Sequence, residues 1–285
     1  MRGLRVLLFI ALFALGVYYV YTHLPVQMEL TTEGLPNLGV DWKYSFRPAA
    51  LDLLAGRSPY ADSGFFNPPW LLLPLLPIAL LSAPLGTAVM FILNLYSYIF
   101  AAFKLRMNAI ILTVFVLFSG ILLNSWNGNV EGLVVLGFLL PPQAGLFFVL
   151  CKPQFGIGVA AFWVIDAWIE GGFRQVVRVV TPVSVALVLS FALFGFWPAK
   201  SPGLVDIWWS SSLFPYGVPV GCALLGVAIW KRDLRFAIAS SPFFAPYVTL
   251  HTWAVVWLGM LLLFPENLAA YREWRGISTP RLEMK

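Results

Sequence analysis

Charged side chains are scarce in this chain. Only 11% of its 285 residues are Asp, Glu, Lys or Arg, whereas 60% are hydrophobic. Soluble domains usually carry about a quarter charged residues, so this composition excludes an ordinary soluble domain. Aromatic residues are frequent near the ends of the apolar runs, as in the interfacial belts of membrane proteins. We therefore expect an all-α polytopic membrane protein in the cell membrane, with the lipid bilayer as a partner.

Residues for metal or redox chemistry are also few, with two cysteines and two histidines. Cys151 and Cys222 lie inside apolar runs and neither has a CxxC partner, so no disulfide or metal site is predicted. The net charge of +5 comes from short basic clusters between apolar runs instead of one basic face. This pattern argues against a nucleic-acid partner. We expect no metal and no cofactor.

The basic clusters indicate the orientation in the membrane, because cytoplasmic loops are enriched in Lys and Arg. We place five clusters in the cytoplasm: Arg2/Arg5, Lys104/Arg106, Arg174/Arg178, Lys231/Arg232/Arg235 and the tail with Arg272, Arg275, Arg281 and Lys285. An even number of crossings then separates neighbouring clusters, and both termini are cytoplasmic. We expect the first apolar run to be an uncleaved anchor, since no small-residue cleavage pattern follows it.

The segment 22–83 determines how the first crossings are counted. Its apolar stretch from Trp70 to Leu81 is short and is interrupted by Pro74 and Pro77. We interpret it as a re-entrant or interfacial helix within a long outer loop. Irregular backbone at membrane depth is tolerated only where protein or a water-filled cavity covers it. A cavity is therefore expected beside this Pro-rich stretch.

About ten transmembrane or half-membrane helices follow from the apolar runs. They are expected at 4–21, 84–103, 108–123, 128–140, 144–152, 154–169, 176–196, 214–230, 236–249 and 252–266. The sequence shows no internal repeat, so we predict one transmembrane domain over residues 1–285.

Polar side chains of the outer segments are the candidate functional residues, because such groups are costly at membrane depth. Asp41 precedes a predicted helix at Tyr44–Leu54, where an aspartate also suits an N-cap. The amides and the carboxylate of 124–131 can bind hydroxyl groups, or can simply form a polar turn. Lys152 precedes the helix-breaking Pro153. Its ammonium either snorkels to the interface or pairs with an anion such as phosphate.

A set of short segments follows one another along the chain in this order: Asp41, Ala49-Ala50, Leu53-Leu54, Gly56, Pro59-Tyr60, Phe66-Asn67-Pro68-Pro69, Pro77, Gly128-Asn129, Lys152-Pro153, Ser241-Pro242 and Tyr247. This order resembles the GT-C superfamily of membrane glycosyltransferases, most closely glycosyltransferase family 87, the polyprenyl-phosphate-mannose-dependent mannosyltransferases. The chain departs from that family in its shorter length, in Asn129 where the family usually has Gln, and in Val248 where the family often has Asp.

The resemblance implies a GT-C-like fold and transfer of mannose or another hexose from a polyprenyl-phosphate donor. The acceptor would be a hydroxyl of a glycan, glycolipid or protein on the outer side. A lipid phosphate leaves as an anion, so one carboxylate base is enough for an inverting displacement, unlike the two carboxylates of glycosidases. Asp41 is the expected base. Lys152, with Arg47 and Arg57 behind it, is expected to stabilise the phosphate.

Eight further residues are expected to bind the sugar or the acceptor by stacking or hydrogen bonding: Trp42, Tyr44, Tyr60, Trp126, Asn127, Asn129, Glu131 and His251. The Pro-rich stretch 67–82 would let a prenyl chain lie beside the cavity. Two other functions stay open, namely a non-catalytic GT-C-like subunit of a membrane complex and a lipid or solute transporter. Transporters usually show repeated halves, which this sequence lacks. Sugar transfer requires Asp41 and Lys152 to line one cavity.

Overall fold

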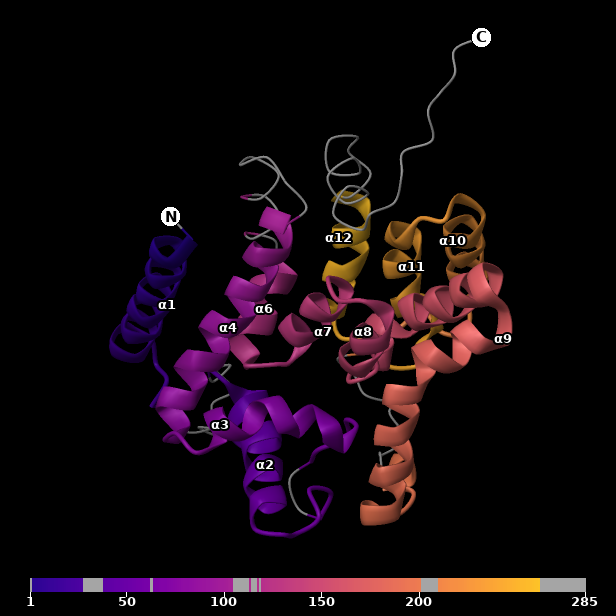
Figure 1. Ribbon diagram of the computed structural model, residues 1–285. Coiled ribbons are helices and arrows are strands. Elements are labelled where there is room, and N and C mark those ends of the chain that lie inside the picture. Colours follow the sequence, from indigo (N-terminus) through magenta and orange to yellow (C-terminus); the bar gives the residue numbers. More distant parts are fainter. Residues whose placement is uncertain are drawn as a thin grey trace.

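The computed structural model describes residues 2–27, 38–61, 64–104, 113, 117, 119–200 and 210–261. Across these residues the regular structure is helical and no strand occurs (Figure 1). In chain order the elements are α1 (Arg2–His23), η1 (Trp42–Phe46), α2 (Arg47–Leu54), η2 (Pro69–Leu75), α3 (Leu76–Ala79), α4 (Ala83–Lys104), α6 (Ser119–Asn127), α7 (Glu131–Phe138), α8 (Pro142–Val149), α9 (Pro153–Phe194), η3 (Trp197–Lys200), α10 (Val218–Lys231), α11 (Leu234–Ser240), η5 (Ser241–Phe244), η6 (Leu250–Trp253) and α12 (Ala254–Leu261).

Three of the described helices, α1, α4 and α9, are long and apolar enough to cross a membrane. The all-α class expected from the composition therefore holds for the described residues, and the apolar helices suit a membrane protein. The ten crossings stay a prediction. Helices α7 and α8 have eight residues each, so each rises only about 12 Å. Most of the predicted span 108–123, the end of 252–266 and the basic tail lie outside the described residues.

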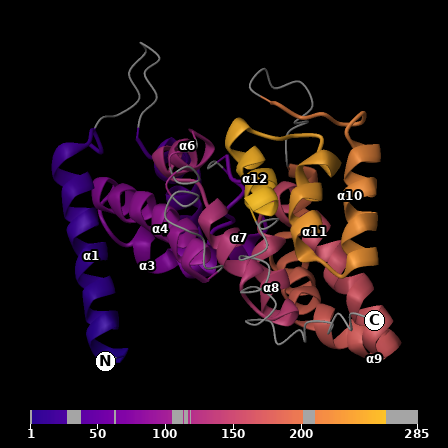
Figure 2. The ribbon, with the colours of Figure 1, turned by 90° about the horizontal axis from the view of Figure 1, so that it is seen from above.

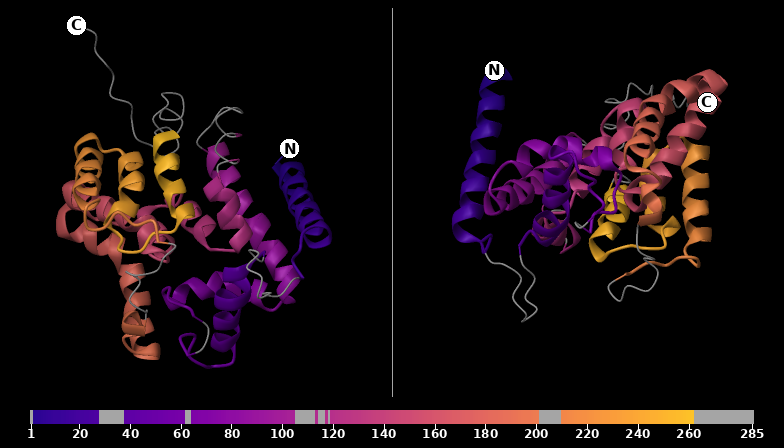
Figure 3. Two further views of the ribbon diagram at one scale, coloured as in Figure 1. Left: turned by 180° about the vertical axis from the view of Figure 1, so that it is seen from behind. Right: turned by 90° about the horizontal axis from the view of Figure 1, so that it is seen from below.

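Helix α1 packs on α4 at one edge of the molecule, and α9 lies at the opposite edge (Figures 2 and 3). The rings of Phe9 and Phe13 meet Tyr96 of α4 edge-on, with centroids 5.2 and 5.5 Å apart. Apolar side chains such as Leu7 and Leu15 are exposed on the remaining surface of α1. An exposed apolar face of this kind is suited to contact with lipid.

Helix α9 bends sharply in its middle. Gly171 and Gly172 leave the helical conformation there, and Gly172 has a φ of +59° and a ψ of −154°. Glycine adopts this backbone geometry without the steric penalty that a Cβ brings. The bend gives α9 two arms, which match the two helices predicted at 154–169 and 176–196. Helices α10 and α11 pack on α9, and α12 packs on α11 (Figure 1).

The Pro-rich stretch forms two short pieces, the 3-10 helix η2 and the single turn α3. Both pack on α2, and α3 also packs on α4. Trp70, Leu71, Leu72 and Leu75 are buried in this packing, and Trp70 Nε1 donates a hydrogen bond to the carbonyl oxygen of Phe147, 3.0 Å away. One side of the stretch is therefore covered by protein, whereas Leu73 and Leu80 on it are exposed.

Candidate functional site

One cavity brings together residues that are far apart in the sequence. It has a volume of about 720 Å³ and is lined by Asp41, Asn129 and Lys152, among others. Asn127 and His251 also line it. We call it the Asp41 cavity. The structure thus places the carboxylate and the ammonium in one hollow, which the interpretation as a glycosyltransferase requires.

Asp41 lies directly before η1, but its side chain does not cap that helix. Its backbone is already helical, with φ −66° and ψ −38°, and the carboxylate accepts no hydrogen bond from a helix N–H. Instead Oδ2 of Asp41 accepts a hydrogen bond of 2.6 Å from Nδ2 of Asn129. The N-cap alternative from the sequence therefore does not hold, and the carboxylate is directed toward the turn between α6 and α7.

Asn129 connects the carboxylate to the ammonium. While its Nδ2 donates to Asp41, its Oδ1 accepts hydrogen bonds from Lys152 Nζ at 3.0 Å and from the backbone N–H of Val130 at 2.7 Å. The backbone donor fixes which end of the amide is oxygen, because only the oxygen can accept. Asp41 and Lys152 are therefore held near each other by an intervening amide, without a direct ion pair between them in the described structure.

Lys152 forms an ion pair with Glu131, which lies behind the wall of the cavity. Nζ of Lys152 donates to Oε1 of Glu131 at 2.6 Å, and the Glu131 side chain is fully buried. Glu131 does not line the cavity, so it is not placed to bind sugar hydroxyls as the sequence suggested. Its position at the first residue of α7 also suits the positive end of the helix dipole. Glu131 holds the ammonium in place.

His251 adds a neutral ring to this network. Its Nε2 lies 2.8 Å from Thr249 Oγ1 and 3.4 Å from Glu131 Oε1, and Thr252 donates to the same carboxylate oxygen at 3.1 Å. Burial lowers the pKa of His251 to about 4, against the opposing effect of Glu131. At neutral pH the imidazole is therefore uncharged, and it lines the cavity as a hydrogen-bonding group.

Burial also shifts the pKa of Asp41, but in the opposite direction. Removal from water raises the pKa of the Asp41 carboxyl above its ordinary value, while Lys152 and the hydrogen bond from Asn129 lower it and Glu131 raises it. Desolvation disfavours the charged form of an acid. A carboxylate with a raised pKa is a stronger base than one in water, which suits it to accept a proton.

Asn94 is a site residue that the sequence analysis missed. It lies within the apolar helix α4, and its Nδ2 donates to the carbonyl oxygen of Asn129 at 2.6 Å. Its Oδ1 accepts from the backbone N–H of Gly132 at 3.0 Å and from Nδ2 of Asn124 at 3.2 Å. An amide in an otherwise apolar helix was the available signal. Asn94 fixes the backbone of the turn that carries Asn129.

The two arginines suggested as phosphate ligands lie outside the cavity. Arg47 donates from Nε and Nη2 to the carbonyl oxygen of Leu81, at 3.3 and 3.1 Å. Arg57 is exposed and pairs with Asp52 at 2.5 Å. Neither lines the Asp41 cavity, so of the three suggested cations the structure brings only Lys152 to it.

The predicted stacking residues do not line the cavity either. Trp42 is fully buried, and a Cβ at Gly86 would lie only 2.6 Å from its Nε1. Tyr44 is exposed, and Trp126 packs with the small apolar cluster between α1 and α4. Tyr60 stacks in parallel on Trp197 with ring centroids 5.8 Å apart.

Trp197 is a tryptophan that does line the cavity, together with Phe46, Phe66 and Tyr247. It lies in η3, just after the second arm of α9. No sequence pattern distinguishes it from the other tryptophans. Its contact with Tyr60 shows that the end of α9 lies next to the segment between α2 and η2.

An apolar groove adjoins the Asp41 cavity. It has a volume of about 630 Å³ and is lined by aliphatic residues from both arms of α9, such as Ile157, Ala161 and Val183. Pro68, Pro153 and Trp197 line both the groove and the cavity. The site therefore combines a polar end, which contains Asp41 and Lys152, with an apolar extension along α9.

Among the described residues, no group of three or more His, Cys, Asp or Glu side chains is arranged to hold a metal ion. Comparisons of the chain with protein-family models, with curated proteins and with solved structures find no match.

Proposed function

We propose that this protein is a membrane glycosyltransferase that moves a hexose from a polyprenyl-phosphate donor to an acceptor hydroxyl. One observation carries the proposal: Asp41 and Lys152 are bridged by Asn129 in a cavity that adjoins an apolar groove. A lipid-linked sugar has the matching parts, since it joins a polar sugar phosphate to a long apolar chain.

Asp41 supplies the base in this proposal. The acceptor oxygen attacks the anomeric carbon of the sugar while its proton passes to the Asp41 carboxylate. The bond between the anomeric carbon and the phosphate oxygen breaks, and the lipid phosphate leaves as an anion. This single displacement inverts the anomeric configuration. The raised pKa of Asp41 supports its role as the proton acceptor.

Lys152 is the cation for the departing phosphate. An ammonium has three N–H donors, and two of them are used in hydrogen bonds to Asn129 and Glu131. The third is available to an oxygen in the cavity that Lys152 lines. A fixed donor near a developing negative charge lowers the barrier for its formation.

The orientation predicted from the basic clusters places the Asp41 cavity on the outer side. Gly86 at the start of α4 contacts Trp42 beside the cavity, and Lys104 lies at the other end of the same helix. In α9, Lys152 precedes the first arm, while Arg174 follows the bend. Lys104 and Arg174 thus lie at the ends of these helical segments that are remote from the cavity, as expected for cytoplasmic cations.

Val248, where the family that the sequence resembles often has Asp, is fully buried and does not line the cavity. Its backbone carbonyl accepts hydrogen bonds from the N–H and hydroxyl groups of Ser211. The proposed chemistry needs no acid at that position.

Replacement of Asp41 by Asn tests the proposal. We expect D41N to reduce the rate of sugar transfer from a polyprenyl-phosphate-hexose donor by roughly 100- to 10,000-fold, because the base is lost. The matched control is D52N, the same substitution at an aspartate of α2 outside the cavity. Both variants are reconstituted in liposomes and checked for equal thermal unfolding temperatures. Full transfer by a folded D41N variant would remove Asp41 from the base role.

A further inference from the structure

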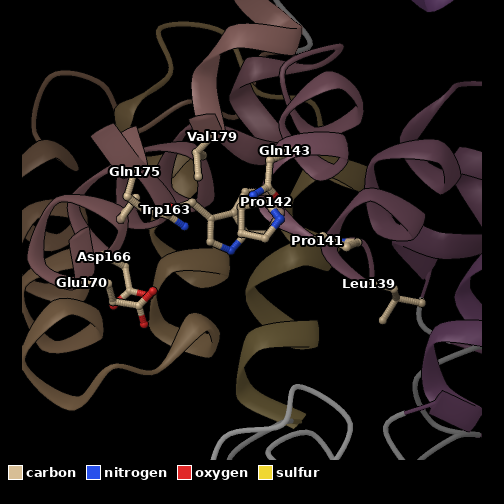
Figure 4. Close-up of a pocket in the computed structure, with 10 residues that line it drawn as sticks. Leu139, Pro141, Pro142, Gln143, Trp163, Asp166, Glu170, Gln175 and Val179 are labelled. Atoms are coloured by element: carbon tan, nitrogen blue, oxygen red, sulfur yellow. The ribbon is translucent and has the colours of Figure 1, made fainter. Parts of the chain in front are cut away.

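A second polar cavity lies at the bend of α9. It has a volume of about 620 Å³ and is lined by residues of both arms of α9 and by the turn between α7 and α8. Figure 4 shows the carboxyl groups of Asp166 and Glu170 next to each other on one side and Pro142 and Gln143 on the other, with the indole of Trp163 between them. We call it the α9-bend cavity.

The two carboxylates of this cavity are only partly neutralised. Arg232, just after α10, places Nη1 3.5 Å from Glu170 and 3.8 Å from Asp166. One guanidinium therefore serves two carboxylates, and the group of three keeps a net charge of −1. All three side chains are partly exposed. A further cation, such as an ammonium, is attracted to this position.

Two unpaired cations lie immediately beside the acidic group. Arg174 and Arg178 line a neighbouring hollow of about 570 Å³, which shares Gln175 with the α9-bend cavity. Neither arginine forms an ion pair within the described part of the chain. Guanidinium groups bind phosphate oxygens well because their donors match the geometry of the anion. Opposite charges are thus available on the two sides of Gln175.

Trp163 gives an independent indication of a ligand. Its side chain is 1% exposed, lines the α9-bend cavity, and carries a buried Nε1–H without a hydrogen-bond partner. A buried donor without an acceptor is unfavourable, and most such groups in proteins are paired. An acceptor oxygen that enters the cavity is the group that would satisfy it.

The surroundings favour a lipid as the source of the ligand. Trp168 and Phe173 on either side of the bend, and Trp230 two residues before Arg232, are all exposed aromatic residues. Trp and other aromatic residues are enriched where membrane proteins meet the lipid headgroups. A headgroup among these aromatic residues would lie beside both the carboxylates and the arginines, whose hollows share Gln175.

We propose that the α9-bend cavity binds the headgroup of an aminophospholipid. The ammonium would lie at Asp166 and Glu170, and the phosphate at Arg174 and Arg178. This site is separate from the Asp41 cavity and does not depend on sugar transfer. Phosphatidylethanolamine has the required pair of groups, whereas phosphatidylcholine has a quaternary ammonium that cannot donate N–H hydrogen bonds.

Lipid binding to the purified, delipidated protein tests this proposal. We expect native mass spectrometry to show that short-chain phosphatidylethanolamine binds roughly tenfold more tightly than phosphatidylcholine, because hydrogen bonds to charged groups are lost in the latter. The variant D166N/E170Q is expected to abolish this preference. R174Q/R178Q should weaken binding of both lipids and leave the preference unchanged. Soluble phosphoethanolamine is expected to compete poorly.

The control variant is R57Q, which removes an exposed arginine far from the bend and should leave both affinities unchanged. If D166N/E170Q does not fold, E170Q alone carries the test, since Glu170 is the more exposed carboxylate. Equal binding of the two lipids by the wild type, or an unchanged preference in a folded carboxylate variant, would overturn the proposal. Competition by soluble phosphoethanolamine as strong as that of the lipid would overturn the lipid assignment.

Discussion

The Asp41 cavity and the α9-bend cavity contain similar groups in different states. At the Asp41 cavity, the lining residue Lys152 is 6% exposed, and a 2.6 Å hydrogen bond joins it to the fully buried Glu131 behind the cavity wall. In the α9-bend cavity, Arg232 is half-exposed and approaches its carboxylates no closer than 3.5 Å. Buried, hydrogen-bonded charges have one fixed arrangement, whereas exposed pairs exchange with water.

This difference in burial matches the two different uses proposed for the cavities. The proposed sugar transfer requires groups held within fractions of an ångström of a productive position, and the hydrogen-bonded network of Asp41, Asn129 and Lys152 suits that requirement. Recognition of a headgroup needs only complementary charge, which the loosely paired groups of the α9-bend cavity provide. This comparison of the two cavities can be tested by removing one charge from the Lys152–Glu131 pair and one from the group of Arg232, Asp166 and Glu170.

The largest effect is expected at Glu131. Replacement by Gln leaves the buried Lys152 ammonium without its counter-ion, so we expect E131Q to lower the free energy of unfolding by roughly 3–5 kcal/mol. Thermal and denaturant unfolding in detergent measure this change. The double variant E131Q/K152M should be less destabilised than the sum of the two single changes, because each single change breaks the same pair. Additive losses would show that the pair does not matter.

A smaller effect is expected from pH through His251. Its ordinary pKa is 6.5, and burial lowers it to about 4. Between these values the unfolded chain binds a proton that the folded chain does not, so stability falls as the pH is lowered from 6.5 toward 4, with a slope of at most about 1.4 kcal/mol per pH unit. Above pH 6.5 the contribution is constant.

Unfolding temperatures across this range check the prediction, with H251Q as the variant that should lose this dependence. The raised pKa of Asp41 acts in the opposite direction, since a folded-state carboxyl that holds its proton gains stability at low pH. The comparison is therefore made in a D41N background, where the difference between the slopes with and without His251 reports on the ring. An equal slope with and without His251 would show that the ring is not buried in its neutral form.

The smallest effect is expected at Arg232. It bridges Asp166 and Glu170 from a half-exposed position, and exposed ion pairs contribute about 0–1 kcal/mol. We expect R232Q to change the free energy of unfolding by less than about 1 kcal/mol, and less still at high salt. A loss as large as that of E131Q would mean that the two ion pairs do not differ as described.

Part of the site could be predicted from the sequence because polar residues are rare in it. Asp41, Asn129 and Lys152 stood out as groups that are costly in an apolar setting, and the structure brings them together. Lys152 was also marked by Pro153, which begins α9. The scarcity of polar residues singled out these three as candidates, but it did not predict which side chains they contact.

The remaining features depend on contacts between distant segments. Glu131 and Asn129 are both polar residues of the same segment. Asn129 lines the cavity, whereas Glu131 lies behind its wall and pairs with Lys152. Trp42 and Trp197 are both tryptophans near apolar runs, but Trp42 is fully buried with Gly86 and Gly128 packed closely against it. Asn94 was overlooked because its role appears only when α4 meets the turn before α7.

The most direct test of the central claim is the affinity for the leaving group itself. Binding of a polyprenyl phosphate, without sugar, is measured by calorimetry for the wild type, K152M and D41N. If Lys152 and Asp41 act on one ligand in one cavity, K152M should weaken binding by roughly tenfold or more through loss of a charged donor. D41N should bind at least as tightly as the wild type, since it removes a negative charge near the phosphate. Unchanged affinity in a folded K152M variant would contradict the account.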